Sequence, residues 1–344
     1  MNKSVASRDP SHILQIGMGF LASKTLLSAV ELELFTHLGA GAMNGAQIGK
    51  CLGLHARSLF DFLDALVSLG ILERDGDGPA GRYSNTPQSA AFLDKKSPTY
   101  VGGILEMANT RLYRFWADLT TALKTGQPQS EIKSGGGSPF EALYADEKRL
   151  EQFLKAMQNA QTGNFRALAA KVDLSDHGTL LDIGGANAFL STVMARKYPN
   201  LNCISFDLPQ VAAIARRRIA ESGFSERIKI VSGNFFTDVL PRADVITMGN
   251  ILHDWDEVQK QALIAKAYAA LNPGGLFIAI ENVIDDARRT NTFGLLMSLT
   301  MLIEVPGGFD YTGAQFDRWC KAAGFKRTEV IALTGPSSAA IAYK

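Results

Sequence analysis

Apolar positions in the first part of the chain recur at the spacing of a helix. Between His12 and about Leu38 they lie three, four or seven residues apart, with small and polar residues between them. This spacing predicts a packed pair of helices. Helical patterns follow at 46–52 and 57–69, and two short strand patterns at 70–74 and 82–84 flank a turn rich in Gly, Asp and Pro. This order of elements predicts a winged helix.

From Thr179 onward the pattern alternates between short apolar runs and helical stretches. We expect strands at 179–183, 202–206, 228–232, 244–248 and 276–281, with helices beginning at Phe189, Gln210 and Glu257. Such alternation is typical of a doubly wound α/β domain with a parallel sheet. Only residues 334–337 separate two late strands at 326–333 and 338–343, so we expect them to form an antiparallel hairpin.

The two patterns divide the chain into parts. We expect a mainly α-helical domain with a winged helix over residues 1–100, a helical linker over 101–170, and the α/β domain over 171–344. A Gly- and Ser-rich segment at 126–139 interrupts the linker and is expected to be a flexible loop or lid. We find no internal repeats.

Charge changes the interpretation of the winged helix. The chain of 344 residues has 35 Lys and Arg against 34 Asp and Glu, so it has no overall field that would attract phosphate backbones or anionic lipid. The second helix of the winged helix carries Arg57 against Asp61 and Asp64, whereas phosphate contacts need clustered cations. We therefore expect a packing or dimerisation module, with no nucleic acid or membrane as partner.

The cysteines and the apolar stretches suggest the compartment. Cys51, Cys203 and Cys320 are far apart and form no CxxC pair, which argues against a disulfide framework and against a zinc site. The N-terminus has no apolar stretch of signal-peptide type, and the stretch 294–305 is too short to cross a bilayer. We expect a cytoplasmic protein without a metal.

A ligand crevice is predicted where the first strand of the sheet ends. Asp182-Ile183-Gly184-Gly185 is a strand that enters a glycine turn before a helix, so backbone approaches something closely there. Asp207 ends the next strand about 20 residues later, a spacing at which a carboxylate binds the hydroxyls of an adenosine ribose. His253 is the one of five histidines that comes directly after a buried strand pattern. Each feature alone also has an ordinary structural explanation. The glycines would form a turn, Asp207 would cap a helix, and His253 would be a structural histidine.

Five motifs together make the assignment specific. They are Asp182-Ile183-Gly184-Gly185, Phe206-Asp207-Leu208-Pro209, Leu252-His253-Asp254-Trp255, Leu271-Asn272-Pro273-Gly274-Gly275 and Pro306-Gly307-Gly308. In this order they resemble the small-molecule O-methyltransferases related to caffeic acid and acetylserotonin O-methyltransferases, over nearly the whole chain. The resemblance implies a Rossmann-like class I methyltransferase sheet, S-adenosylmethionine as cofactor with S-adenosylhomocysteine as product, and an intertwined homodimer.

The resemblance also implies roles for individual residues. His253 corresponds to the general base, held by the acidic residues Glu281 and Asp310. A base near neutral pH suits a hydroxyl acceptor, because a phenol has a pKa near 10. The residues expected at the cofactor are Asp182, Gly184, Gly185, Asp207, Leu208, Asn234, Phe235, Met248 and Asn250. Ordinary core packing would explain Phe235 and Met248 equally well.

An acceptor pocket for a flat or apolar small molecule is expected beside the base. Its expected residues are Met107, Tyr113, Phe115, Trp116, Phe153, Met157, Asp254, Met297, Met301 and Ile303. The helical spacing of the apolar members also fits plain core packing. Arg111 or Arg114 would bind an acceptor carboxylate, or lie on a solvated helix face.

Two departures from the family pattern weaken the cofactor assignment. Ala186 and Ala188 stand where the family has glycine, so each adds a Cβ where backbone should approach ligand or adopt positive φ. Asn234 replaces the acid that contacts the adenine amino group, and its side-chain oxygen accepts a hydrogen bond without a charge.

Other functions remain open at this stage. The nearest alternative is an S- or N-methyltransferase in which His253 only positions the acceptor. A relative that binds the cofactor without transferring the methyl group and a ligand-responsive winged-helix DNA-binding protein are also possible. A nicotinamide-dependent dehydrogenase fits least, since the terminal hairpin and the His-Asp-Trp motif have no role there.

Overall fold

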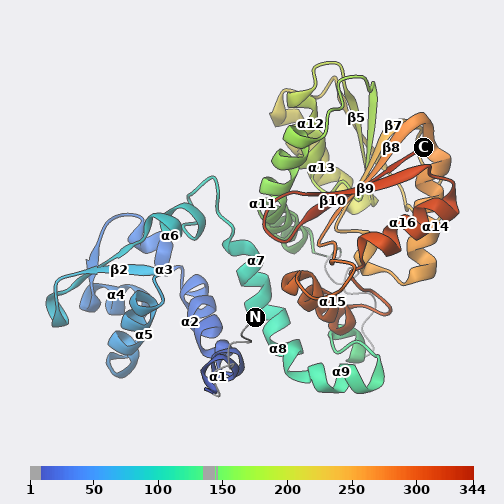
Figure 1. The fold of residues 1–344 in the computed structure, drawn as a ribbon. Helices are drawn as coiled ribbons and strands as arrows, with labels where there is room; N and C mark the ends of the chain where they lie inside the picture. Colours follow the sequence, from blue (N-terminus) through green and yellow to red (C-terminus); the bar gives the residue numbers. More distant parts are fainter. Residues whose placement is uncertain (1–8, 135–143, 145) are drawn as a thin grey trace, which may run out of the picture. The chain divides into compact units, whose positions relative to one another are not determined.

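The computed structural model of the chain describes residues 9–134, 144 and 146–344 (Figure 1). The chain divides into two compact units, one ending at Tyr113 and one formed by Arg114–Lys344, and each is described by itself. Part of the segment expected to be a flexible loop, residues 135–139, lies outside the described residues.

The first unit packs short helices against a small sheet. Its helices are α1 (Ser11–Gly17), α2 (Gly19–Glu31), α3 (Leu34–Leu38), α4 (Gly45–Leu52), α5 (Ala56–Ser68), α6 (Pro87–Phe92) and α7 (Gly102–Met107). Its antiparallel sheet has the order β1 (Met43–Asn44), β3 (Arg82–Asn85), β2 (Leu72–Asp75). The expected helices and the β2–β3 ribbon are confirmed. The two-residue strand β1 was not expected, because so short a segment carries no alternating pattern.

Local sequence explains where α4 begins and ends. Asn44 accepts a hydrogen bond from the backbone of Gln47, whose side chain in turn accepts one from the backbone of Asn44, which is a capping box. Gly53 follows the helix with φ +66°, a conformation that glycine adopts without steric cost. Inward-facing Leu63 and Leu66 of α5 then pack in the core of this unit. The term winged helix stays an interpretation of this arrangement.

The N-terminal helices leave much apolar surface exposed. No residue of α1 is buried, and Ile13 and Ile16 are 73% and 68% exposed. By length and composition alone, the stretch Ser11–Glu31 is long and apolar enough to cross a membrane. No such stretch near the N-terminus was expected from the sequence, and the stretch 294–305, expected to be too short to cross a bilayer, lies mostly in α15 (Thr292–Glu304).

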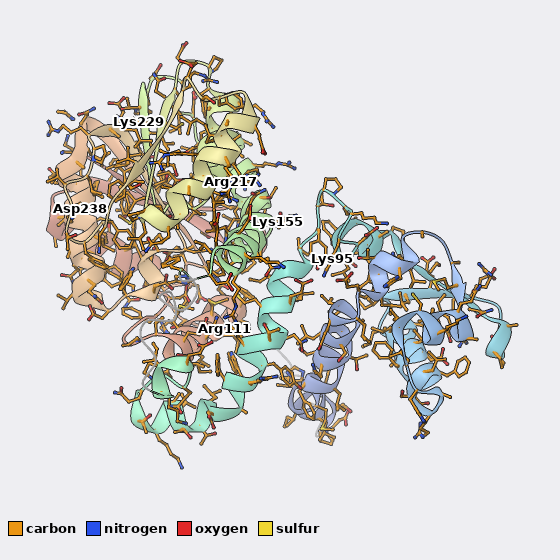
Figure 2. The ribbon with its side chains drawn as sticks, turned by 180° about the vertical axis from the view of Figure 1, so that it is seen from behind. Lys95, Arg111, Lys155, Arg217, Lys229 and Asp238 are labelled. Carbon is orange, nitrogen blue, oxygen red and sulfur yellow. The ribbon has the colours of Figure 1, made fainter. Side chains whose placement is uncertain are left out.

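The second unit begins with helical segments and contains one long helix. After α8 (Tyr113–Phe115) and α9 (Leu119–Thr125), the helix α11 (Glu147–Lys171) starts at Asp146, whose side chain accepts hydrogen bonds from two backbone N–H groups of its first turn. On its outer side α11 is joined to α13 (Pro209–Ser222) by Arg217, which pairs with Glu147 at 2.8 Å and with Glu151 at 3.7 Å (Figure 2).

A seven-stranded mixed sheet forms the centre of the second unit. Its order is β6 (Ile228–Ser232), β5 (Asn202–Asp207), β4 (Thr179–Ile183), β7 (Ala243–Gly249), β8 (Leu271–Glu281), β10 (Ser338–Tyr343), β9 (Arg327–Ala332). The first five strands are parallel, and β10 pairs antiparallel with both β8 and β9. The parallel sheet and its terminal antiparallel hairpin are confirmed.

The start of β8 corrects one expectation. The strand begins at Leu271 rather than at 276, and residues 272–275 form an irregularity within it, where the register with β7 shifts between Ala243 and Val245. Gly275 is required there, because a Cβ would lie 2.6 Å from the carbonyl oxygen of Asp244. The Asn-Pro-Gly-Gly sequence indicated only a turn.

Helices cover both faces of this sheet (Figure 1). On one face α14 (Glu257–Ala270) and α16 (Gly313–Ala323) pack with the sheet into one apolar core. On the other face α12 (Phe189–Lys197), α13 and the end of α11 form the second core. Because helices cover both faces, a ligand site is expected at the edge where the carboxyl ends of the parallel strands meet and carry polar side chains.

Candidate active site

The glycine turn after β4 is shaped by close packing. Gly184 has φ +68°, and a Cβ on it would lie 2.3 Å from the side chain of Ile251. A Cβ on Gly185 would lie 2.2 Å from the hydroxyl of Ser205. The need for glycine therefore already follows from the side chain of Ile251, just after β7, and from that of Ser205 in β5.

The two alanines that replace glycines adopt left-handed backbone conformations. The φ angles are +50° at Ala186 and +61° at Ala188, where an alanine is strained. The backbone N–H of Ala186 donates to Oδ2 of Asp207 over 2.8 Å, and Oδ1 of Asp207 accepts the N–H of Leu208. Asp207 thus ties the strained turn to the end of β5. Burial raises the pKa of Asp207 to about 6.

A pocket opens between this turn and α11. The sheet side contributes Asp182, which is 3% exposed and accepts a hydrogen bond from Thr247 over 2.7 Å. Burial raises the pKa of Asp182 to about 7. The lining residues are Leu154, Met157, Gln158, Gln161, Phe165, Asp182, Gly184, Gly185, Ala186, Asn187, Phe189, Leu190, Gly249 and Asn250. The structure therefore brings the expected Asp182, Gly184, Gly185 and Asn250 together.

Met157 of α11 was expected at the acceptor, but the other α11 residues that line this pocket were not expected from the sequence. Gln158 accepts a hydrogen bond from the side chain of Asn187 over 2.8 Å, which links α11 to the glycine turn. Leu154, Gln158, Gln161 and Phe165 are spaced three or four residues apart and so share one face of the helix. That spacing was the available signal, but nothing in it distinguishes a pocket wall from a packed face.

The other residues expected at the cofactor have varied surroundings. Leu208 is half-buried and precedes α13, and Asn234 is exposed, with its side-chain oxygen accepting the N–H of Phe236. Phe235 is half-buried and contacts the ring of Trp255 edge-on. Met248 lies fully inside the core, which corresponds to the alternative interpretation of this residue.

A short turn carries His253, and Glu281 holds it. The turn is a 3-10 segment, Leu252–Asp254, that follows β7. Oε1 of Glu281, at the end of β8, accepts the backbone N–H groups of Ile251 at 3.1 Å, Leu252 at 2.7 Å and His253 at 3.3 Å. Glu281 is 1% exposed, and burial raises its pKa to about 7. Glu281 thus contacts the backbone of the turn, and its expected role in holding the histidine stays a prediction.

The ring of His253 lies between two carboxylates. Its Nδ1 is 3.5 Å from Oδ1 of Asp310, and its Nε2 is 3.5 Å from Oδ1 of Asp254. Burial lowers the pKa of His253, but its interactions with Asp254, Asp310 and Glu281 outweigh burial and raise the pKa to about 10. The imidazole therefore carries a proton at neutral pH in the ligand-free protein.

The residues expected at the acceptor lie in both units. Met107, which is half-buried at the end of α7, and Tyr113, which begins α8, belong to the first unit. The other expected residues belong to the second unit. Phe153 and Ala186 pack against the same buried apolar cluster, and Met157 lines the pocket at the glycine turn. Phe115, Trp116 and Met297 are half-buried, and Met301 and Ile303 are buried. In the described part of the chain, no group of three or more His, Cys, Asp or Glu residues forms a candidate metal site.

The chain matches two family models and is similar to known proteins over most of its length. A family model described as the O-methyltransferase domain matches residues 116–326, and one described as the O-methyltransferase dimerisation domain matches residues 14–95. The chain is 40% identical to the tetracenomycin polyketide synthesis 8-O-methyl transferase of Streptomyces glaucescens, over 98% of this chain and 97% of that one. It is 36% identical to an N,N-dimethyltransferase of Streptomyces rimosus, over 81% and 80%.

A solved structure has the same fold. Human N-acetylserotonin methyltransferase, determined in complex with S-adenosylmethionine, superimposes with a TM-score of 0.90 at 29% identity. The match covers 98% of this chain and 99% of the human one.

We predict that Ala186→Gly stabilises the protein. Glycine avoids the steric cost of a left-handed alanine, which is about 1–2 kcal/mol. It also loses more backbone entropy on folding, which opposes this gain by about 0.5–1 kcal/mol. The free energy of unfolding in urea should rise by about 0.5–1 kcal/mol. Ala195→Gly inside α12 is the matched control and should lower it by about 1 kcal/mol or more. A loss at Ala186 equal to that at Ala195 would contradict strain at this turn.

Proposed function

The chain belongs to the O-methyltransferase family, and from this premise we propose that it transfers the methyl group of S-adenosylmethionine to a hydroxyl group of a small polyketide, with His253 as general base. One observation carries the residue assignment. His253 lies at the carboxyl edge of the sheet between two carboxylates, on a turn fixed by a third. The name of the Streptomyces glaucescens relative supports a polyketide acceptor.

The polar groups at the pocket fit a sulfonium nucleoside that carries an amino acid. Asp182, Gln158, Gln161 and Asn187 line the pocket and provide partners for an ammonium and a carboxylate. Asp207 is half-buried beside the strained turn and is suited to the ribose hydroxyls. Leu208, Asn234 and Phe235 are proposed to follow it along the nucleoside. We propose that Met248 acts only as packing beneath Gly249 and Asn250.

The protonation state of His253 links the cofactor to catalysis. When bound, S-adenosylmethionine supplies an electrophilic methyl group on a positively charged sulfur. A positive charge nearby disfavours a second one, so the imidazolium loses its proton more easily in the complex than in the free protein. Nδ1, facing the buried Asp310, keeps its hydrogen, and Nε2 is then the atom that accepts the proton of the acceptor hydroxyl.

Asp254 is proposed to orient the acceptor. Its Oδ1 lies beside Nε2 of His253, so a hydroxyl that reaches Nε2 also meets this carboxylate. Burial raises the pKa of Asp254, and a hydrogen bond from the acceptor would compensate the buried carboxylate. Phe115, Trp116, Phe153, Met157, Met297 and Met301 would form apolar walls suited to a flat ring system.

Transfer to nitrogen is the second candidate, because the Streptomyces rimosus relative is an N,N-dimethyltransferase. A neutral amine attacks through its lone pair before it loses a proton, so a base is less important for that reaction. The dependence of the rate on His253 therefore distinguishes the two acceptors.

We propose a homodimer formed through the N-terminal helices. The dimerisation domain matches residues 14–95, and α1 and α2 expose Ile13, Ile16 and Phe20. A contiguous apolar surface of this kind is typical of an interface. The nearly equal numbers of basic and acidic residues do not favour nucleic acid or a membrane as partner. We propose a cytoplasmic location, which the free cysteines Cys51, Cys203 and Cys320 support.

We predict that His253→Ala lowers kcat about 10²–10⁴-fold on a hydroxyaromatic probe such as a hydroxynaphthoate. S-adenosylhomocysteine should form in equal amount to the methylated product in the wild type. Calorimetric binding of S-adenosylhomocysteine by the variant is the control and should be retained. A loss of less than about tenfold would argue against base catalysis, and no S-adenosylhomocysteine with any acceptor would argue against methyl transfer.

We predict that Ile16→Glu separates the dimer. A charge on this 68% exposed position would be buried in the proposed interface, which should raise the dissociation constant at least about tenfold in sedimentation experiments. Val258→Glu, on α14 outside the dimerisation match and 76% exposed, is the matched control and should leave the dimer intact. Dissociation by both substitutions, or by neither, would count against this interface.

A further inference from the structure

Lys260 is a fully buried lysine close to the proposed active site. It lies one turn into α14, with 0% of its surface exposed, on the same face of the helix as the core residues Leu263, Ile264 and Ala267. Lysine is almost never fully buried without a partner, because removal of an ammonium from water is costly. Nothing in the residues around it distinguishes it among the 35 Lys and Arg residues of the chain.

The two contacts of Lys260 are with neighbours of the His253 site. Its Nζ donates a hydrogen bond to the carbonyl oxygen of Trp255 and lies 3.5 Å from the centre of the Phe309 ring. Trp255 directly follows Asp254, and Phe309 directly precedes Asp310. Lys260 therefore connects the two chain segments whose carboxylates lie on either side of the imidazole.

The carboxylates around His253 need positive charge. Asp254, Glu281 and Asp310 all interact with His253, and Lys260 interacts electrostatically with the same three. Oε2 of Glu281 and both carboxylate oxygens of Asp310 are buried without a hydrogen-bond partner within the described residues. Three negative charges facing one imidazole would hold its proton too firmly for a base.

We propose that Lys260 is a positioning residue of this active site: its buried ammonium fixes the segments that carry Asp254 and Asp310 and opposes their negative potential at His253. The proposal rests on the proposed role of His253 as base. Asp256, at the start of α14, and Tyr311, beside Glu281, also face this cluster. Tyr144 interacts electrostatically with Asp254.

The direction of the electrostatic effect follows from the charges. A cation near the imidazole disfavours its protonated form, so removal of the cation raises the pKa of His253. Less of the histidine is then in the basic form at neutral pH, and the rise of kcat/KM with pH moves to higher pH. Burial lowers the pKa of Lys260 to about 8, against the opposing effect of the carboxylates, so this influence fades above that pH.

The test measures the titration of His253 by proton NMR in the complex with S-adenosylmethionine and no acceptor, because the sulfonium is proposed to lower the pKa of the imidazole into the range in which Lys260 is charged. The signal is identified among the five histidines by its loss in His253→Gln. In Lys260→Met the midpoint should rise by on the order of one pH unit. Lys266→Met is the matched control. Lys266 lies in the same helix and donates to the backbone carbonyls of Phe236 and Asp238, away from the carboxylates, so its loss should leave the midpoint unchanged.

A second variant separates charge from hydrogen bonding and covers the case in which Lys260→Met does not fold. Lys260→Gln keeps a donor for Trp255 without a charge, and it should show the same rise. The acid limb of the kcat/KM profile on the hydroxynaphthoate probe should move in parallel. No rise in Lys260→Gln, or an equal rise in Lys266→Met, would overturn the proposal. The titration needs no turnover, so this result is independent of whether methyl transfer itself is observed.

Discussion

The structure of the site depends on one buried carboxylate. Oε1 of Glu281 accepts three consecutive backbone N–H groups, from Ile251 to His253, and so fixes the turn that leaves β7 to the end of β8. A turn whose donors were left unpaired inside the protein would cost several kcal/mol. Because the strand and the turn are fixed together, the position of His253 relative to the glycine turn is set by the sheet itself. Loops alone would position these groups less accurately.

This arrangement has an electrostatic consequence. The carboxylate that fixes the turn, together with Asp254 and Asp310, makes the surroundings of His253 strongly negative, and the pKa of the imidazole is raised to about 10. An imidazole that keeps its proton at neutral pH cannot act as a base, whereas negative surroundings attract a positively charged ligand. We therefore infer that the site is completed electrostatically by the charge of its cofactor and by Lys260, and that the resting protein holds the histidine in its protonated form.

Much of the fold was predictable from sequence, because its signals are periodic or local. The alternation after Thr179 predicted the strands, and the short link at 334–337 predicted the hairpin. The left-handed φ at Ala186 and Ala188 agrees with the expectation, drawn from the family resemblance, that these two positions suit glycine. The pocket wall on α11 and the contacts of Lys260 depend on distant parts of the chain, and no local pattern encodes them. For the same reason the family resemblance suggested only that Glu281 holds the histidine, and its contact with three backbone N–H groups of the turn could not be predicted.

The most direct test of this account is the number of protons released when the cofactor binds. It can be measured by calorimetry near pH 8.5 in buffers of different ionisation enthalpy. S-adenosylmethionine and S-adenosylhomocysteine differ by one methyl group and one positive charge. If the sulfonium converts His253 into a base, S-adenosylmethionine should release more protons than S-adenosylhomocysteine, and His253→Gln should abolish the difference. Equal proton release by the two ligands in the wild type would contradict the account.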